Sequence, residues 1–389
     1  MLNLKNKLSV LALFSLLSAS CLAKDLGPAQ SARVLFVAAV TSETVPGISV
    51  AVADKTGILW AEGFGYADLE NQVAMSPVHT LRVGSVAKVM TAAAMMRMYQ
   101  KKLIELDTPV TQYTPDWPTF HADITLRQLA AHTSGIRHYK PGANEFLLNQ
   151  PFADLKSALA LFKDEALLFT PGTQHQYTTF GWTLVSAAME GAEAKRSFKQ
   201  IMQQEVFEPL AMHHTYFDEQ YQIIANRARP YSYYQGQLLN SPQTDHSYKW
   251  AGGGFIATPS DVSRFAVGQL NEGYLNPETV KLMFTKAKLN NGEEVNHGIA
   301  WDIGFNSYIG RSDYQNDEVQ AMMKAMPHAV THAGGSMGGT TMLILCGDHA
   351  RAVTVVKNVN GERSADVFLL ALKTLSYYHK LHKLNADKA

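Results

Sequence analysis

A serine and a lysine stand three residues apart, as Ser85 and Lys88, at the start of a run rich in alanine, methionine and valine. Nothing in the sequence breaks this run before Leu103, so the pattern predicts a long internal helix. Residues three apart share a helix face, which would place the amine beside the hydroxyl. A buried lysine has a lowered pKa and can accept the serine proton, and N–H groups at a helix N-terminus can stabilise an oxyanion. The pair therefore predicts acyl transfer through serine; the alternative is a capping serine followed by a solvated lysine.

Two later segments carry groups that would complete such a site. Tyr177 follows a proline-glycine loop and opens another predicted helix, so its phenol could pass the serine proton to a leaving group. Residues 332–335, His-Ala-Gly-Gly, come before an apolar strand. Glycine there would let a substrate backbone approach closely, and a backbone N–H could donate to an oxyanion.

Strand patterns lie near both ends of the chain, and helical patterns fill the middle. The predicted strands are 47–54 and 57–65, which form a hairpin, and 299–304, 340–345 and 351–358. The predicted helices, besides the one after Ser85, are 31–40, 125–132, 157–162, 180–190, 196–206, 258–270 and 367–379. This order predicts one discontinuous α/β domain, 24–104 with 285–389, interrupted by a mostly helical domain at 105–284.

The overall charge balance and the first 23 residues indicate which partners to exclude and where the protein is located. The 389 residues include 34 basic and 34 acidic side chains without a basic run, which argues against nucleic acid. Residues 1–23 are typical of a secretory signal, because lysines precede an apolar run at 8–19 that is too short for a membrane anchor. We expect cleavage after Ala23 and a periplasmic or secreted protein. The alternative is lipoprotein processing at Cys21, which would anchor the chain to a membrane.

Cysteine and histidine spacing predicts no metal site. Once the signal is removed, Cys346 is the one remaining cysteine; it follows an apolar run, so we expect a buried strand cysteine without a disulfide. Several histidines lack convergent acids at metal-ligand spacing and are expected in loops or at the surface, at positions 121, 132, 138, 213 and 214. No metal and no cofactor are predicted.

The order of nucleophile, tyrosine loop and histidine-glycine strand resembles the serine β-lactamase and penicillin-binding superfamily, specifically its class C and carboxypeptidase-like branch. The closer resemblance is to the group that contains the mitochondrial serine β-lactamase-like protein and its bacterial relatives. It is carried by four segments in register, 129–140, 177–181, 226–229 and 247–255, and covers nearly all of the mature chain. It implies an antiparallel sheet flanked by helices and interrupted by a mostly helical domain.

The resemblance implies a role for each matching position. Ser85 would be the acylated nucleophile and Lys88 its proton acceptor, because Ser-x-x-Lys is the nucleophile motif of penicillin-recognising enzymes. Tyr177 matches the tyrosine of the family's Tyr-x-Asn motif. The remaining implied positions are His332, Ala333 and Gly334, which match the Lys-Thr-Gly or His-x-Gly strand, and Gly335, whose N–H would form the oxyanion hole with that of Ser85.

Two positions depart from the family pattern. Thr179 stands where many members have an asparagine that helps to hold the substrate amide and the lysine. Ala333 stands where a threonine hydroxyl often binds the substrate carboxylate, and a missing hydroxyl costs on the order of 1 kcal/mol. His332 could supply a positive charge there only when protonated. Efficient β-lactam hydrolysis is therefore not expected.

The sequence thus predicts an exported serine hydrolase that works through a Ser85 acyl-enzyme, with a peptidase or amidase favoured. Its substrate would be a small peptide, an ester or a β-lactam-like molecule. An esterase, a weak β-lactamase or a D-Ala-D-Ala carboxypeptidase would use the same groups. An alternative of another class is a non-catalytic scaffold or filament-forming protein that kept the fold. The sequence predicts no particular oligomeric state.

Overall fold

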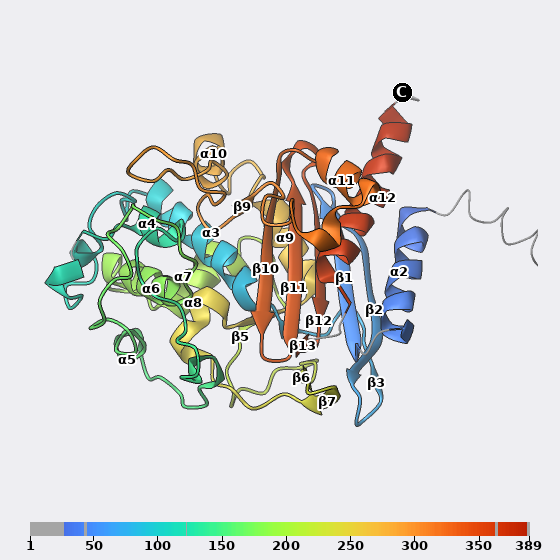
Figure 1. Cartoon of the computed structure of the whole chain (residues 1–389), viewed down its shortest axis with the longest axis horizontal. Coiled ribbons are helices and arrows are strands. Elements are labelled where there is room, and N and C mark those ends of the chain that lie inside the picture. Colours follow the sequence, from blue (N-terminus) through green and yellow to red (C-terminus); the bar gives the residue numbers. More distant parts are fainter. Residues whose placement is uncertain (1–26, 43–44, 122, 362–364, 387–389) are drawn as a thin grey trace, which may run out of the picture.

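The computed structural model describes residues 27–42, 45–121, 123–361 and 365–386. The predicted signal, including Cys21, lies outside the described residues. Within them, an antiparallel sheet of seven strands has the order β3-β2-β1-β12-β11-β10-β9 (Figure 1). Its strands are β1 (Gly47–Asp54), β2 (Gly57–Asp68), β3 (Val73–Ala74), β9 (Asp302–Ile303), β10 (Ala329–Ser336), β11 (Gly339–Cys346) and β12 (Arg351–Lys357). Strands from both ends of the chain therefore meet in one sheet, where β1 pairs with β12.

Alternate residues of the central strands face two different hydrophobic cores. In β11, Met342 and Ile344 are buried on the face covered by the N- and C-terminal helices. Leu343 and Leu345 point to the other face and join the core of the helical region. This period of two is what a strand buried on both sides requires.

Helices cover both faces of this sheet. On the outer face lie α2 (Pro28–Ser42), α11 (Asp317–Lys324) and α12 (Val367–Ala386), at the right of Figure 1. On the inner face, α9 (Pro259–Gly268) packs against β1 and β12. The hydroxyl of Ser263 in α9 donates to the carbonyl of Ala51 at 3.1 Å and bonds Thr354 Oγ1 at 2.8 Å.

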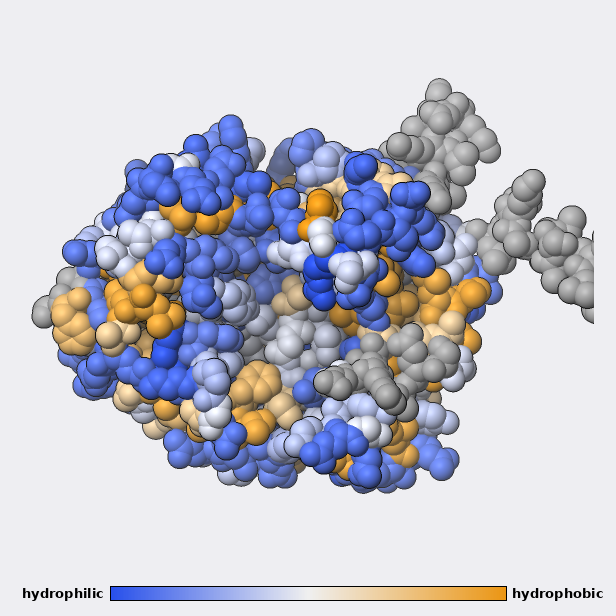
Figure 2. All heavy atoms as spheres, viewed as in Figure 1, coloured by the Kyte–Doolittle hydropathy of each residue, from blue (hydrophilic) through white to orange (hydrophobic). Residues whose placement is uncertain are grey.

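The middle of the chain forms the helical region beside β10, at the left of Figure 1. Its helices are α3 (Ala87–Gln100), α4 (Leu126–Ala130), α5 (Leu155–Leu159), α6 (Phe180–Ala192), α7 (Phe198–Met202), α8 (Trp250–Gly253) and α10 (Pro277–Met283). Two small sheets accompany them, with strands β4 (Leu81–Arg82), β5 (Thr215–Phe217), β8 (Phe255–Ala257), β6 (Tyr231–Tyr234), β7 (Gln237–Asn240) and β13 (Val359–Gly361). Polar side chains cover most of the face in Figure 2, with apolar patches between them.

The predicted antiparallel α/β fold is confirmed, whereas several predicted element boundaries differ from the structure, and three of them are instructive. The helix after Ser85 begins at Ala87, because residues 84–86 form a 3-10 turn. The strand predicted at 299–304 shrinks to β9, since Ala300 and Gly304 have positive φ angles of 68° and 74° that end an extended segment. The helix predicted at 196–206 begins at Phe198 and widens into a π-helical turn.

Two further findings concern the described helices and Cys346. Across the described part of the chain, no helix combines the length and the apolar character that crossing a membrane requires. Cys346 ends β11 and is 1% exposed, which confirms the buried strand cysteine. The division into two domains stays a prediction.

Candidate active site

The turn that carries Ser85 is pressed against strand β10. Gly84 has a φ of 53°, and a Cβ at this position would lie 2.6 Å from the carbonyl oxygen of Gly335. A Cβ on Gly334 would lie 2.0 Å from the carbonyl oxygen of Val83. Glycine on both sides is therefore needed to bring the serine turn and the strand together.

An arginine just before the turn ties it to the end of β10. The Nε atom of Arg82 pairs with Asp218 at 2.7 Å, and a terminal N–H donates to the carbonyl of Met337 at 2.8 Å. Asp218 is nearly fully buried, so this ion pair fixes the backbone that leads into Ser85.

Lys88 lies in the first turn of α3 with its amine against Ser85. The Nζ atom is 3.0 Å from Ser85 Oγ, 3.1 Å from Thr179 Oγ1 and 2.5 Å from the carbonyl oxygen of Gly252. The last contact ties α3 to α8, as does the bond of 2.9 Å that the Thr91 hydroxyl donates to Ala251. The structure thus brings the predicted nucleophile and base within hydrogen-bonding distance. Thr179 occupies the asparagine position and still contacts the lysine.

The environment of Lys88 favours the neutral amine. The side chain is fully buried, and none of the ion pairs found among the described residues includes it. Burial lowers its pKa well below the ordinary value, and the positive charge of Lys249 lowers the pKa further. A neutral Nζ can donate to Gly252 and Thr179 while its lone pair accepts the proton of Ser85.

Tyr177 packs its ring against the amine of Lys88. The Nζ atom lies 4.9 Å from the ring centroid, and the Tyr177 hydroxyl is close enough to Ser85 for the serine to moderate the phenol pKa. Burial raises the pKa of Tyr177, so the phenol stays protonated at neutral pH. A protonated phenol beside the nucleophile can donate a proton to a departing group.

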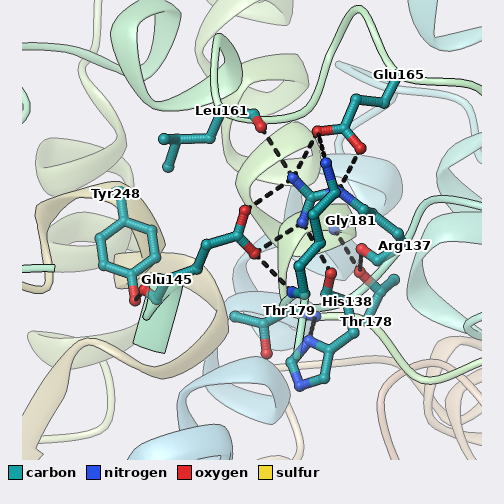
Figure 3. Close-up of polar contacts among 10 residues, drawn as sticks. Arg137, His138, Glu145, Leu161, Glu165, Thr178, Thr179, Gly181 and Tyr248 are labelled. Carbon is teal, nitrogen blue, oxygen red and sulfur yellow. Dashed lines mark hydrogen bonds and ion pairs between the residues drawn. The ribbon is translucent and has the colours of Figure 1, made fainter. Parts of the chain in front are cut away.

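The loop that holds Tyr177 is bonded to the segment around Arg137 (Figure 3). Thr178 donates its hydroxyl to the carbonyl of Arg137 at 2.6 Å, and the N–H of Thr179 donates to His138 Nδ1 at 3.2 Å. The hydroxyl of Thr178 also accepts from the N–H of Gly181 at 3.3 Å, inside the first turn of α6. These bonds fix the position of the tyrosine loop against the Arg137 segment and the start of α6.

The Arg137 guanidinium is the centre of that network. Its N–H groups donate to Glu145 at 2.8 and 2.9 Å and to Glu165 at 2.7 and 2.8 Å, both in a bidentate manner. Two further bonds reach the carbonyls of Leu161 and His138, at 3.0 and 2.9 Å. Bidentate arginine pairs are the strongest geometry for carboxylates, so this cluster is a rigid support for the tyrosine loop.

Strand β10 presents alternate residues to different surroundings. Ala333 and Gly335 are exposed, whereas His332 and Gly334 are buried. The Nδ1 atom of His332 lies 2.6 Å from the carbonyl oxygen of Ala333. Burial, with the charge of Lys88, lowers the pKa of His332 to about 3. The histidine is therefore neutral above that pH and supplies no cation, contrary to one option considered from the sequence.

A cavity of about 270 Å³ opens beside Ser85. Its walls also include Thr179, Gly252, Gly335 and the aromatic ring of Phe146. A larger cavity of about 500 Å³ lies between α5 and the end of α6, but none of these site residues lines it. The smaller cavity is the candidate substrate site, because it contains the nucleophile.

Lys249 contributes a cation to this cavity that the sequence analysis did not assign. It is buried, its amine lies 4.3 Å from the ring centroid of Phe146, and Tyr139 and Tyr248 lie nearby. Burial and the charge of Arg82 lower the pKa of Lys249 to about 7. The position belongs to the motif 247–255, and a lysine among aromatic and glycine residues was the signal that could have found it.

The sequence also did not predict a cluster of imidazole rings that lies next to Tyr177. His132 lies in a turn, as expected, but it is fully buried, with its ring 4.4 Å from that of Tyr177. The ring centroid of His297 lies 5.4 Å from that of His132 and 4.8 Å from that of His175. The Nε2 atom of His297 is 3.2 Å from Asp302 Oδ1. Burial lowers the pKa of His175 and His297 to about 4, so these rings are neutral around Tyr177. The members come from distant segments, and no sequence spacing marks them.

Residues 33–375 match the sequence model of the family described as Beta-lactamase. The chain belongs to the Beta-lactamase family. Members of this family and of the penicillin-binding group are serine hydrolases, which makes this chain a serine hydrolase by class. The antiparallel sheet, the helical region and the Ser85 turn at their junction are the architecture expected for the family.

Known relatives agree with that assignment. The human "Serine beta-lactamase-like protein LACTB, mitochondrial" is 28% identical over 81% of this chain and 71% of its own length. Among solved structures, the D-amino acid amidase from Ochrobactrum anthropi has a TM-score of 0.73 at 18% identity, covering 90% of this chain and 98% of the amidase. The octameric penicillin-binding protein homologue from Pyrococcus abyssi has a TM-score of 0.71 at 22% identity, covering 90% of this chain and 77% of the homologue.

Proposed function

We propose that the protein is an exported serine hydrolase that forms an acyl-enzyme on Ser85 from an amide or peptide substrate. The observation that carries this proposal is the distance of 3.0 Å between Lys88 Nζ and Ser85 Oγ, at a lysine whose pKa burial lowers well below its ordinary value. A capping serine followed by a solvated lysine would not produce this contact.

The reaction follows from the positions of the side chains. Ser85 Oγ attacks the substrate carbonyl carbon while Lys88 accepts the hydroxyl proton. The N–H groups of Ser85 and Gly335 are the donors assigned to the oxyanion. The Lys88 ammonium returns that proton through the Tyr177 phenol to the leaving amine, so both side chains regain their starting protonation. A water molecule then attacks the acyl carbon with Lys88 as base, and the proton returns to Ser85 Oγ as the acid product leaves.

The residues of strand β10 favour a substrate that has no terminal carboxylate. Ala333 exposes only a methyl group at the position where family members offer a hydroxyl, and neutral His332 adds no charge. Any residual preference for a carboxylate would come from Lys249, and it should weaken as the pH rises through about 7. Internal peptide bonds, amides and esters need no carboxylate clamp. The amidase among the structural neighbours uses this fold on an amide, which supports the same bond type here.

A substrate panel tests this proposal. We expect hydrolysis of an amino acid amide, an internally cleaved peptide and an ester to exceed that of a penicillin and a D-Ala-D-Ala peptide. Ala333→Thr should raise β-lactam acylation by about fivefold, the value of one hydrogen bond of about 1 kcal/mol, with ester turnover as the matched control. β-Lactam hydrolysis by the wild type at the rates of resistance enzymes, or an unchanged rate in Ala333→Thr, contradicts the proposed selectivity.

Export is the second part of the proposal and rests on residues 1–23. The mass of the mature chain should correspond to a first residue of Lys24, and the protein should fractionate outside the cytoplasm. A lipid-modified N-terminus at Cys21 would instead establish the lipoprotein route. A chain that keeps Met1 and stays in the cytoplasm contradicts export.

A further inference from the structure

Three side chains with metal-binding donor atoms meet at the end of the sheet that is remote from Ser85. Cys346 is the last residue of β11, His349 ends the short 3-10 turn that follows, and His379 lies on α12. Their donor atoms all lie within 4.8 Å of one another, and no other such group of three occurs among the residues described. The cluster was invisible in the sequence because α12 adds its member 30 positions after the second ligand.

The separation of Cys346 and His349 fits a tetrahedral ion. Zinc binds thiolate sulfur at about 2.3 Å and imidazole nitrogen at about 2.0 Å, which places neighbouring ligand atoms about 3.5 Å apart. The Sγ atom of Cys346 is 3.4 Å from His349 Nδ1. The rings of His349 and His379 have centroids 4.2 Å apart and an interplanar angle of 73°, an edge-on arrangement and not a stack.

The surroundings hold the three side chains in place. Cys346 is 1% exposed and His379 is 7% exposed, while His349 is partly open to solvent. A guanidinium N–H of Arg351 donates to the carbonyl of Tyr378 at 2.8 Å, which joins β12 to α12 beside the cluster. Cys346 is paired with Arg351 in the sheet, so the strand of Cys346 and the helix of His379 are joined through Arg351. An ion can enter from the side of His349.

We propose that Cys346, His349 and His379 form a zinc site with a fourth position open to water. A thiolate and two imidazoles suit Zn²⁺ better than Mg²⁺ or Ca²⁺, which require oxygen ligands. The Asp348 carboxylate nearby accepts from His328 Nδ1 at 2.8 Å and is not needed as a ligand.

The role of this site is structural. The eight residues of β11 separate Cys346 from the Ser85 end of the sheet by about 23 Å, at about 3.3 Å per residue. The ion thus cannot reach the substrate carbonyl. It would instead join α12 to the turn between β11 and β12, and so hold the C-terminal helix on the sheet. This inference is independent of the proposed hydrolase activity.

Cobalt titration of the purified, chelator-treated protein tests the site. We expect one Co²⁺ per chain, with a thiolate-to-cobalt charge-transfer band and the intense visible bands of tetrahedral cobalt, both displaced by Zn²⁺. Zinc should also raise the Tm. Cys346→Ser should lose the charge-transfer band, and His349→Gln and His379→Gln should weaken binding by at least about tenfold. His328→Gln, a nearby histidine outside the site, is the matched control and should bind as the wild type does.

The proposal is overturned by a wild-type chain without a stoichiometric cobalt spectrum, or by a spectrum and affinity that persist in Cys346→Ser and His379→Gln. Near-UV circular dichroism checks that each variant is folded. If Cys346→Ser does not fold, the two histidine variants decide the question, because each removes one ligand and keeps the buried thiol.

Discussion

Replacement of Arg137 by methionine should cost about 3 kcal/mol of unfolding free energy. The side chain of Arg137 is 9% exposed and that of Glu145 is 13% exposed, so the pair is almost removed from water. Breaking one partner of a buried pair costs about 3–5 kcal/mol, because the other charge stays buried and unpaired. Glu165 adds little to that cost, since it is about one-third exposed and keeps Lys140 at 2.8 Å. Methionine fills most of the space that the methylene groups of arginine occupied. The expected loss therefore lies at the lower end of the range of about 3–5 kcal/mol.

Urea unfolding followed by tryptophan fluorescence measures this loss, and a second variant isolates its cause. In Arg137→Met the carboxylate of Glu145 stays buried without its partner, and adding Glu145→Gln removes that charge. The double variant should therefore be more stable than the sum of the two single effects predicts. Acylation should fall as well, because the lost guanidinium contacts hold the segment whose backbone carbonyl at position 137 accepts from Thr178 in the tyrosine loop. A loss below about 1 kcal/mol, or strictly additive effects, would refute the reasoning about a buried pair.

The acid dependence of stability provides a check on the same network. Hydrogen bonds from Arg137 and Lys140 lower the pKa of Glu165 to about 2 from 4.5. A lowered folded-state pKa contributes stability that is complete above pH 4.5 and is lost as the pH falls toward 2. Arg137→Met should weaken this acid dependence, and an unchanged pH profile would contradict the assigned cause.

Further changes probe the site itself. Lys88→Arg should lower acylation by at least about 100-fold without unfolding the protein, because a guanidinium cannot accept the serine proton; stopped-flow acylation measures it. Lys249→Gln should move the acidic limb of the pH–rate profile to higher pH, since the charge of Lys249 lowers the pKa of Lys88; an unmoved limb would exclude that coupling. Gly84→Ala should reduce turnover by up to about 100-fold by pushing β10 from Ser85. Gly292→Ala, with a φ of 88° and no atom within 4 Å, is its control for backbone strain, and equal turnover in the two would contradict the steric argument.

Much of the fold was predictable because its signals are local. The alternation of β1 and β2 around a glycine turn predicted the hairpin, and the alanine- and methionine-rich run predicted α3. The start of α3 was not predictable from composition, because the positive φ of Gly84 and its close approach to Gly335 of β10 are tertiary features. That contact joins residues about 250 positions apart.

For the candidate site, too, local features were predictable and features that depend on tertiary contacts were not. The contact between Ser85 and Lys88 was predictable because helical spacing is visible in the sequence, and the place of Tyr177 beside them was predicted from its motif and its position before α6. The charge state of His332 was not predictable, since its pKa depends on burial and on the charge of Lys88, which comes from a distant segment. The histidines around Tyr177 and the pairing of Cys346 with α12 depend entirely on tertiary contacts.

The central claim, that Ser85 is the acylated nucleophile, is tested most directly by mass spectrometry of the trapped protein. After reaction with a fluorophosphonate, the intact mass should rise by one adduct, and peptide mapping should place that adduct on Ser85. Ser85→Ala should remain unmodified while keeping the wild-type circular dichroism spectrum. An adduct on Ser134 or Ser336, or equal labelling of Ser85→Ala, would contradict the account.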